Sequence, residues 1–158
     1  MYIAHLGRRF VGALSNAEPS PCDTQWATAQ LTAAEGVLWS RMNAPDRRHA
    51  VVVARCVVEN LGGQAPSWAA AAALLHDVGK VTSGLGTWTR VVATLVPRLW
   101  CRGRFAEYKR HDAIGAELLR ASNSHKYVVA WAGQHHWPPQ MWTVPIAIAA
   151  VLKSCDDD

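Results

Sequence analysis

The stretch PSWAAAAALLHDVGK, from Pro66 to Lys80, decides how this sequence folds. Pro66 suits the first turn of a helix, because proline has no amide hydrogen to leave unpaired there. The alanines and leucines that follow favour helix, and Gly79 is a stop signal. The stretch therefore predicts an alanine-rich helix that ends in a His-Asp pair, His76 and Asp77.

Similar helix signals recur along the rest of the chain. Thr32 and Glu35 have the spacing of a capping box, and Pro45 opens a longer segment that two glycines close. Strand signals are poor, since no hairpin dipeptide separates alternating runs. We therefore expect an all-α fold, a single compact bundle of about six to seven helices, in which residues 31–158 form the domain and residues 1–30 pack on it. The expected helices are 31–42, 44–63, 66–79, 88–100, 111–122, 125–136 and 145–158.

Composition limits the class of protein. The chain has 158 residues, of which 50% are hydrophobic and 18% charged, which is too apolar for a disordered chain and suits one domain. The most apolar stretches, 69–75, 91–96 and 144–152, are much shorter than the roughly 18 to 20 residues of a membrane span, so we expect no membrane segment. The net charge of +4 is compatible with anionic substrates. No block of Lys and Arg exceeds two residues, which argues against nucleic acid as the partner.

The cysteines indicate no metal or redox motif. Cys22, Cys56, Cys101 and Cys155 lie far apart with no Cys-x-x-Cys pair, so a zinc ribbon has no support. In the N-terminal segment MYIAHLGRRFVGALSNA, the basic residues lie in the middle instead of ahead of an apolar core, so we predict no signal peptide. We therefore expect a cytoplasmic protein with free thiols, in which Cys56 and Cys155 serve for packing.

Histidines recur at particular places in the predicted helices. His49 shares a helix face with Val53 and Cys56, so an ionisable group would turn toward the core. Imidazole and carboxylate groups that arrive from several helices at one place are what a divalent metal site needs. Such mixed ligands suit Mn²⁺, Fe²⁺, Co²⁺, Ni²⁺ or Zn²⁺ better than Mg²⁺ or Ca²⁺. The further candidates, all at helix ends, are His76, Asp77, His111, His135, His136 and Asp156.

Taken alone, each of these residues also has a simpler explanation. A single histidine on an apolar face is usually a hydrogen-bonded core residue, and we interpret His5 and His125 in that way. Asp156 belongs to an acidic C-terminal run, at a helix end where the dipole is already negative. That end would fray without a cation nearby, so the alternatives are a solvated acidic tail and a metal ligand at Asp156.

Five segments together resemble the HD-domain metal-dependent phosphohydrolase superfamily, whose pattern is His … His-Asp … Asp. The resemblance covers roughly residues 31–158, and its most specific segment is LLHDVGK, close to the LLHDIGK of the family. The five segments are DRRHAVVVARCV (46–57), LLHDVGK (74–80), HDAIGAELL (111–119), GQHH (133–136) and AAVLKSCD (149–156).

The resemblance implies a site for one or two divalent transition-metal ions. Asp77 would bridge the ions if two are bound, and Lys80 would contact a substrate phosphate, so these are the expected catalytic residues. The implied function is hydrolysis of a phosphomonoester or phosphodiester, a nucleotide or similar small phosphate ester, through a metal-activated hydroxide. The implied ligands are His49, His76, Asp77 and Asp156 for the core of the site, and His111, His135 and His136 for a second ion.

The chain departs from the family pattern in three places. Asp112 replaces a proline whose task is to start the helix, a change that we expect to matter little. Pro45 stands four residues before His49, where members with three metals carry a glutamate, so we expect no third ion. No Gly-Tyr-Pro follows the histidine pair, which argues against the cyclic-dinucleotide phosphodiesterase branch.

A basic and aromatic stretch leads into His111. Its cations could hold the phosphates of a nucleotide while a ring stacks on the base, or it could be a solvated loop whose rings fill the edge of the bundle. The stretch contains Arg98, Trp100, Arg102, Arg104, Phe105, Tyr108, Lys109 and Arg110.

Alternative functions stay open from the sequence. Some members of the superfamily use the same binuclear ligands to activate O₂, so a di-iron oxygenase is the main alternative. A non-catalytic regulatory module usually loses the His and Asp ligands, whereas this chain keeps every one. The sequence makes no prediction of the oligomeric state.

Overall fold

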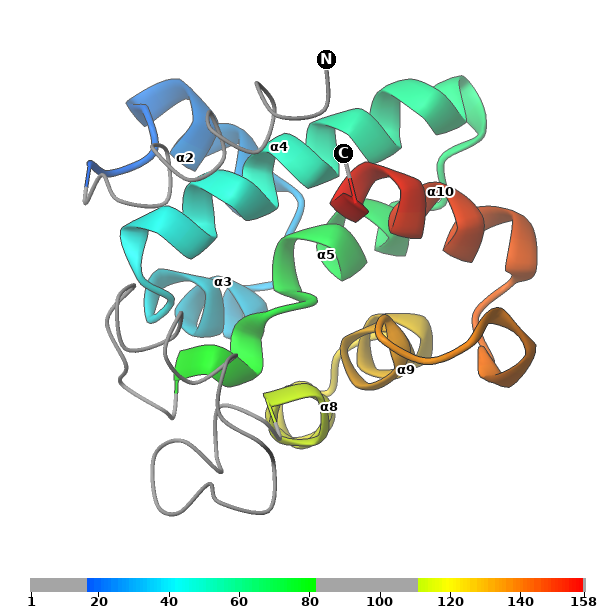
Figure 1. Cartoon of the computed structure of the whole chain (residues 1–158). Coiled ribbons are helices and arrows are strands. Elements are labelled where there is room, and N and C mark those ends of the chain that lie inside the picture. Colours follow the sequence, from blue (N-terminus) through cyan, green and yellow to red (C-terminus); the bar gives the residue numbers. More distant parts are fainter. Residues whose placement is uncertain (1–16, 82–110, 158) are drawn as a thin grey trace, which may run out of the picture.

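The computed structural model describes residues 17–81 and 111–157 (Figure 1). The predicted all-α fold is confirmed, since these ranges contain seven α-helices and no strand. Of the predicted helices, the one expected at 88–100 lies outside the described residues. The helices are α2 (Pro21–Ala29), α3 (Ala33–Ser40), α4 (Ala44–Leu61), α5 (Ser67–Leu75), α8 (His111–Ala121), α9 (Lys126–Gln134) and α10 (Ile146–Asp157).

Local capping explains where several helices begin and end. Thr32 caps α3 in the predicted capping box, accepting from the amide of Glu35 while the Glu35 carboxylate accepts from the amide of Thr32. Helix α4 ends at Gly62, whose φ of 56° falls in the left-handed region that favours glycine. Helix α2, which the sequence did not predict, begins where the Ser20 side chain accepts from the amide of Asp23.

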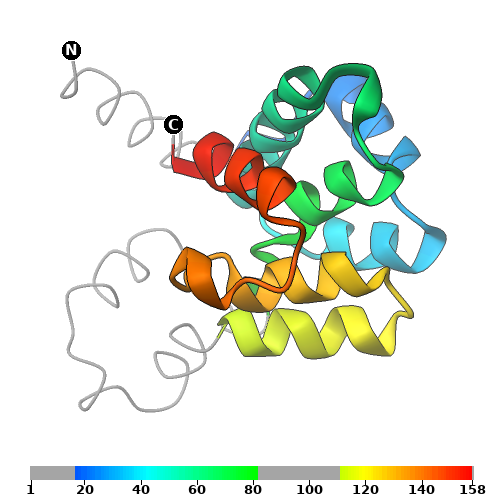
Figure 2. The same cartoon turned by 90° about the vertical axis from the view of Figure 1, so that its right-hand side faces the viewer.

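Helix α5 forms the centre of the bundle. Every residue from Ala69 to Leu75 is buried, which fits the alanine-rich run. Small side chains let α4 and α9 pack closely on either side of α5, and α10 packs along α4 (Figures 1 and 2). Helix α5 stops at Leu75, earlier than predicted, so His76 and Asp77 lie in the turn between α5 and a 3₁₀ turn at Val78–Val81.

Two glycines bring this turn against the start of α8. A Cβ atom at Gly79 would lie 1.9 Å from the carbonyl oxygen of His111 and 2.6 Å from the amide nitrogen of Gly115. A Cβ at Gly115 would in turn lie 3.1 Å from the amide nitrogen of Gly79. Any side chain at Gly79 would therefore push the two backbones apart, and this contact sets how closely Asp77 and His111 approach.

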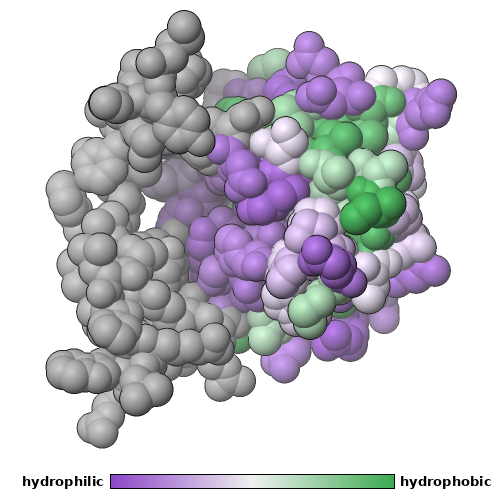
Figure 3. Space-filling view, turned by 45° about the vertical axis from the view of Figure 1, so that its right-hand side comes forward, coloured by the Kyte–Doolittle hydropathy of each residue, from purple (hydrophilic) through white to green (hydrophobic). Residues whose placement is uncertain are grey.

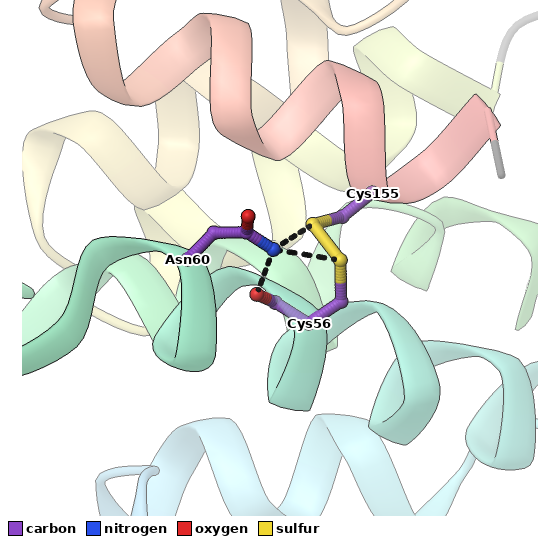
Figure 4. The surroundings of a disulfide bond; sticks show 3 residues. All are labelled: Cys56, Asn60 and Cys155. Carbon is purple, nitrogen blue, oxygen red and sulfur yellow. Dashed lines mark hydrogen bonds between the residues drawn. A yellow bond between two sulfur atoms is a disulfide. The ribbon is translucent and has the colours of Figure 1, made fainter.

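The prediction of free thiols at Cys56 and Cys155 is wrong. These residues form a disulfide that joins α4 to α10, with 5.8 Å between their Cα atoms (Figure 4). A separation of 99 residues and the lack of a motif hid this pair from sequence analysis. Cys22 is exposed and free, and Cys101 lies outside the described residues.

The surface is of mixed polarity. Figure 3 shows hydrophilic residues gathered in the middle of one face, with apolar residues together on the right. Among exposed large apolar side chains, Met141 and Ile146 lie in the segment that leads from α9 into α10. No helix in the described part of the chain has the length and apolar composition that a membrane crossing requires.

Candidate metal centre

Five helices carry the predicted ligands to one region of the bundle. His49 lies on α4, and the other ligands lie at or near the ends of α5, α8, α9 and α10. Their side chains form two groups, in each of which the potential ligand atoms lie within 4.8 Å of one another. The first histidine group contains His49, His76 and Asp156, and the second histidine group contains His111, Asp112, His135 and His136.

The first histidine group is centred on one oxygen of Asp156. Oδ1 of Asp156 lies 3.1 Å from Nε2 of His49 and 3.3 Å from Nε2 of His76. Nitrogen and oxygen ligands bind transition metals at about 2.0 to 2.2 Å, so two ligands of one ion lie about 2.8 to 4.4 Å apart. The first group therefore has the spacing of ligands around a common ion.

The same spacing holds in the second histidine group. Oδ1 of Asp112 lies 2.8 Å from Nε2 of His111, and 3.9 Å from Nε2 of His135 and of His136. The rings of His111 and His136 are 5.5 Å apart between centroids and meet edge to face. This group could hold a second ion beside the first.

Asp77 lies between the two groups and offers one oxygen to each. Its Oδ2 is 3.4 Å from Nε2 of His76 in the first group. Its Oδ1 is 3.4 Å from Nε2 of His111 and 3.9 Å from Nε2 of His135 in the second group. Because a carboxylate can share its oxygens between two ions, this placement fits a bridging ligand.

Hydrogen bonds to the backbone orient the ligating nitrogens. Nδ1 of His76 lies 2.8 Å from the carbonyl oxygen of Ala73, and Nδ1 of His135 lies 3.2 Å from that of Ala132. A carbonyl can only accept, so each Nδ1 carries the proton that it donates. Nε2 is then left to face the centre, as the ligating nitrogen of a metal-bound histidine does.

Some buried atoms of the site lack a hydrogen bond of good geometry. Within the described ranges, Oδ1 of Asp77 and Nε2 of His135 are two such atoms, and their contacts with neighbouring charged groups are long, 3.4 Å from Asp77 to His111 and 3.9 Å from Asp77 to His135. Leaving a buried polar atom unsatisfied costs about 1–3 kcal/mol, and more for a charged group. A bound cation would satisfy both atoms at once, so the residues present fit a metal ion.

In the absence of a bound ion, the histidines of the site have very different pKa values. Burial favours the neutral imidazole of His76, but the charges and hydrogen bonds of Asp77 and Asp156 together outweigh it and raise the pKa of His76 to about 10. Burial likewise opposes the charge on His111, yet hydrogen bonding to Asp112 and Asp77 raises its pKa to about 9. At His135 burial prevails and lowers the pKa to about 3. The metal-free site thus mixes charged and neutral imidazoles.

Comparison with known families agrees with this geometry. The model of the HD domain family matches residues 48–155, which is more than half of the chain. The chain belongs to the HD domain family. Metal-dependent phosphohydrolases make up the superfamily to which this domain belongs, and its members are generally metal-dependent hydrolases. Comparison with curated proteins gave no match, and neither did comparison with solved structures.

The HD domain brings together all seven ligands expected from the sequence. Asp156 is the clearest case, since its side chain is only 14% exposed and contacts two histidines. The alternative of a solvated acidic tail at Asp156 is therefore wrong, because α10 continues through that residue. The seven are His49, His76, Asp77, His111, His135, His136 and Asp156.

Three other expectations have different outcomes. Lys80 forms an ion pair with Oδ2 of Asp77, and its expected contact with a phosphate stays a prediction. This charge is one reason that the pKa of Asp77 lies well below its usual value, although burial acts against it. His125 is not a core residue but an exposed N-cap, whose Nδ1 accepts from the amide of Tyr127. His5 and the basic stretch before His111 lie outside the described residues.

Sequence analysis missed one member of the HD domain site, Asp112. We expected its replacement of proline to be minor, yet its carboxylate lies among three histidines. The available signal was the dipeptide His111-Asp112, which repeats the His76-Asp77 pair and likewise places a carboxylate next to a predicted histidine ligand.

A groove between α8 and α9 begins at this site. It has a volume of about 590 Å³ and is lined by Asp112 and Trp137 near the histidines and by Arg120 and Lys126 farther along. Trp137 follows His136 directly and is 43% exposed. The groove therefore offers an aromatic face next to the candidate metal centre and cations at a distance from it.

Proposed function

We propose that this HD domain hydrolyses a small phosphate ester with the help of two divalent metal ions. Among such esters, a nucleotide is the substrate that we favour. The position of Asp77 carries the proposal, because its two oxygens face separate histidine groups at 3.4 Å from His76 and 3.4 Å from His111. This is the arrangement that a bridging carboxylate of a two-ion site needs.

The residues of the chain would hold the ions and orient the ester. His49, His76 and Asp156 would bind the first ion. The three histidines of the second group, His111, His135 and His136, would bind the second. When bound, divalent ions would supply an activated hydroxide near neutral pH and would offset the negative charge of the phosphate. Lys80, which pairs with Asp77, would turn its ammonium toward a phosphate oxygen once the carboxylate is shared by the ions.

The groove supports the choice of a nucleotide. Trp137 presents an exposed ring beside His136, on which a base could stack. Arg120 and Lys126 line the far part of the groove and could contact a second anionic group. A mononucleotide would thus find a place for its phosphate at the histidines and for its base at Trp137.

Metal analysis followed by an activity screen tests this proposal. Protein purified without chelator should contain up to two transition-metal ions per chain, and it should release phosphate from a panel of nucleotides and other esters with Mn²⁺, Fe²⁺, Co²⁺, Ni²⁺ or Zn²⁺. Asp77→Asn keeps the shape of the side chain and should lower kcat by about 1,000-fold or more, because both ions lose a charged ligand. Asp157→Asn is the matched control, since Asp157 is exposed and pairs with Lys153.

Other results would overturn the proposal. Iron-loaded protein that consumes O₂ and hydrolyses no ester would show a di-iron oxygenase instead. Folded protein that binds none of the five metals would show a regulatory module.

A further inference from the structure

Asp112 takes part in the second histidine group, although relatives usually have a proline there. Its Oδ1 faces Nε2 of His111 at 2.8 Å and Nε2 of both His135 and His136 at 3.9 Å. This oxygen is buried, while the side chain as a whole is 24% exposed. Imidazoles from two helices therefore surround one carboxylate oxygen at the distances that separate ligands of a common ion.

We propose that Asp112 is a direct ligand of the second ion. The chain would then hold that ion with three imidazoles, the carboxylate of Asp112 and the shared carboxylate of Asp77. The inference rests on the proposed function, because it presupposes that the second histidine group binds a metal.

His135 adds a geometric reason for placing an ion at this point. Its Nδ1 lies 3.2 Å from the carbonyl oxygen of Ala132, so Nε2 is the nitrogen that faces the second histidine group. This Nε2 is buried, and Oδ1 of Asp112 and Oδ1 of Asp77 each lie 3.9 Å from it, too far for a hydrogen bond. An ion placed between these three atoms would contact all of them.

An added carboxylate has consequences for the choice of metal. Five ligands from the chain suit an ion that takes six, such as Mn²⁺, Fe²⁺, Co²⁺ or Ni²⁺, and leave one position for water or substrate. Zn²⁺ prefers four ligands and would use this set less well. With Asp112, the centre has three carboxylates, the other two being Asp77 and Asp156. Three negative charges attract two divalent ions more strongly than two negative charges would.

Calorimetric titration with Mn²⁺ alone, without substrate, tests the role of Asp112. The wild-type protein should bind two ions. The Asp112→Asn variant should bind the first ion as the wild type does, and its affinity for the second ion should be about 100-fold lower. Glu117→Gln is the matched control, because Glu117 is an exposed acid on the same helix. Asp112→Pro restores the residue usual in the family at a position where proline is tolerated, and it should bind like Asp112→Asn.

The outcomes separate this inference from the proposed function. If Asp112→Asn and Asp112→Pro bind two ions as tightly as the wild type, the inference is wrong and the proposed function stands. If the wild-type protein binds no Mn²⁺ or other transition metal, both are wrong.

A different observation, the disulfide, carries a second inference. Cys155 directly precedes Asp156, and Cys56 lies two turns beyond His49 on α4. The bond therefore joins the two helices that supply His49 and Asp156 to the first histidine group. The Asn60 amide lies 3.4 Å from the sulfur of Cys56 and 3.8 Å from that of Cys155 (Figure 4).

We infer that this disulfide makes binding of the first ion sensitive to redox state. A cellular dithiol would reduce the bond with two electrons and two protons, giving two thiols on this chain and a disulfide in the dithiol. The last turn of α10 would then be held to α4 only by packing and by the contact of Asp156 with His49. Asp156 would gain freedom that must be lost again on binding, so the first ion would bind more weakly.

Mn²⁺ titration of oxidised and reduced protein tests this inference. The wild type is reduced with a dithiol, freed of it by gel filtration without oxygen, and compared with oxidised protein and with the double variant Cys56→Ser, Cys155→Ser. One of the two binding steps should weaken by about tenfold in the reduced protein and in the double variant, and reoxidation should restore only the former. Cys22→Ser, at an exposed free thiol, should change neither step.

Equal Mn²⁺ affinity in oxidised and reduced protein would overturn this inference without affecting the proposed function. Peptide mass spectrometry that finds Cys56 and Cys155 unlinked after air oxidation would overturn it as well.

Discussion

Nε2 of His49 lies 3.1 Å from Oδ1 of Asp156, although 107 residues separate them in the chain. The contact links the second turn of α4 to the last turn of α10, and the same oxygen also meets His76 at 3.3 Å. One carboxylate thus gathers three helices at the first histidine group. Binding of an ion there should stabilise the whole fold, because the ligands come from segments that lie far apart in the chain.

Asp156→Asn should remove much of the stabilisation that metal gives. A ligand at 100 times its Kd stabilises the folded state by about 2.7 kcal/mol per site, which is roughly 5 to 10 °C in Tm for a chain of this size. Thermal unfolding with and without Mn²⁺ should therefore show the full shift in the wild type and at most half of it in Asp156→Asn. Asp157→Asn, at a neighbouring exposed carboxylate, should retain the full shift. An undiminished shift in Asp156→Asn would contradict the role of that residue.

Metal binding should release protons and should strengthen as pH rises. In the metal-free protein the pKa of His76 is raised to about 10 and that of His111 to about 9, so both rings are charged at pH 7. A ring must be neutral at Nε2 to bind a metal, so saturation at pH 7 should release up to about two protons per chain. Each released proton makes the affinity rise about tenfold per pH unit below these pKa values.

Calorimetry in buffers of different ionisation enthalpy measures these protons. His135 should contribute none, because burial lowers its pKa to about 3 and the ring is already neutral. His125→Ser is a control, since serine also caps helices and His125 lies outside both histidine groups. Affinity that is independent of pH between 6 and 8 would show that neither His76 nor His111 gives up a proton on binding.

Sequence patterns predicted several parts of this fold that depend on neighbours in the chain, although they missed the locally capped α2. The capping box of Thr32 and Glu35 and the glycine end of α4 at Gly62 depend on contacts within four residues, so they could be predicted. Periodicity alone predicts which face of a helix is buried but not which other helix packs against it. The family resemblance was therefore needed to predict that distant ligands such as His49 and Asp156 meet.

Two of the features that escaped prediction join segments distant in the chain. The Cys56–Cys155 disulfide follows only once α4 and α10 are known to meet, although each cysteine has a fixed offset from a predicted ligand. The place of Asp112 among histidines of α9 depends on how α8 and α9 pack. Both features could have been predicted by a further step. If two ligands are expected to meet, the residues next to them in the chain, such as Cys155 beside Asp156 and Asp112 beside His111, are expected to lie near the same site.

Gly79→Ala should separate the turn after α5 from α8. The added Cβ would lie 1.9 Å from the carbonyl oxygen of His111 and 2.6 Å from the amide nitrogen of Gly115, and both are backbone atoms that cannot rotate away. Overpacking of this kind costs about 1–3 kcal/mol. It should also weaken Mn²⁺ binding at the second group, because His111 must move away from Asp77.

Gly36→Ala separates this effect from the general effect of replacing glycine. A Cβ at Gly36 would meet nothing within 4 Å, and the residue lies within α3, so this variant should gain up to about 1 kcal/mol of stability. Urea unfolding and Mn²⁺ titration of both variants give the comparison. If Gly79→Ala were as stable as the wild type and bound Mn²⁺ equally well, the approach of the two backbones would not set the distance between Asp77 and His111. A loss of stability with unchanged Mn²⁺ affinity would instead show that α8 moves as a body without carrying His111 out of reach.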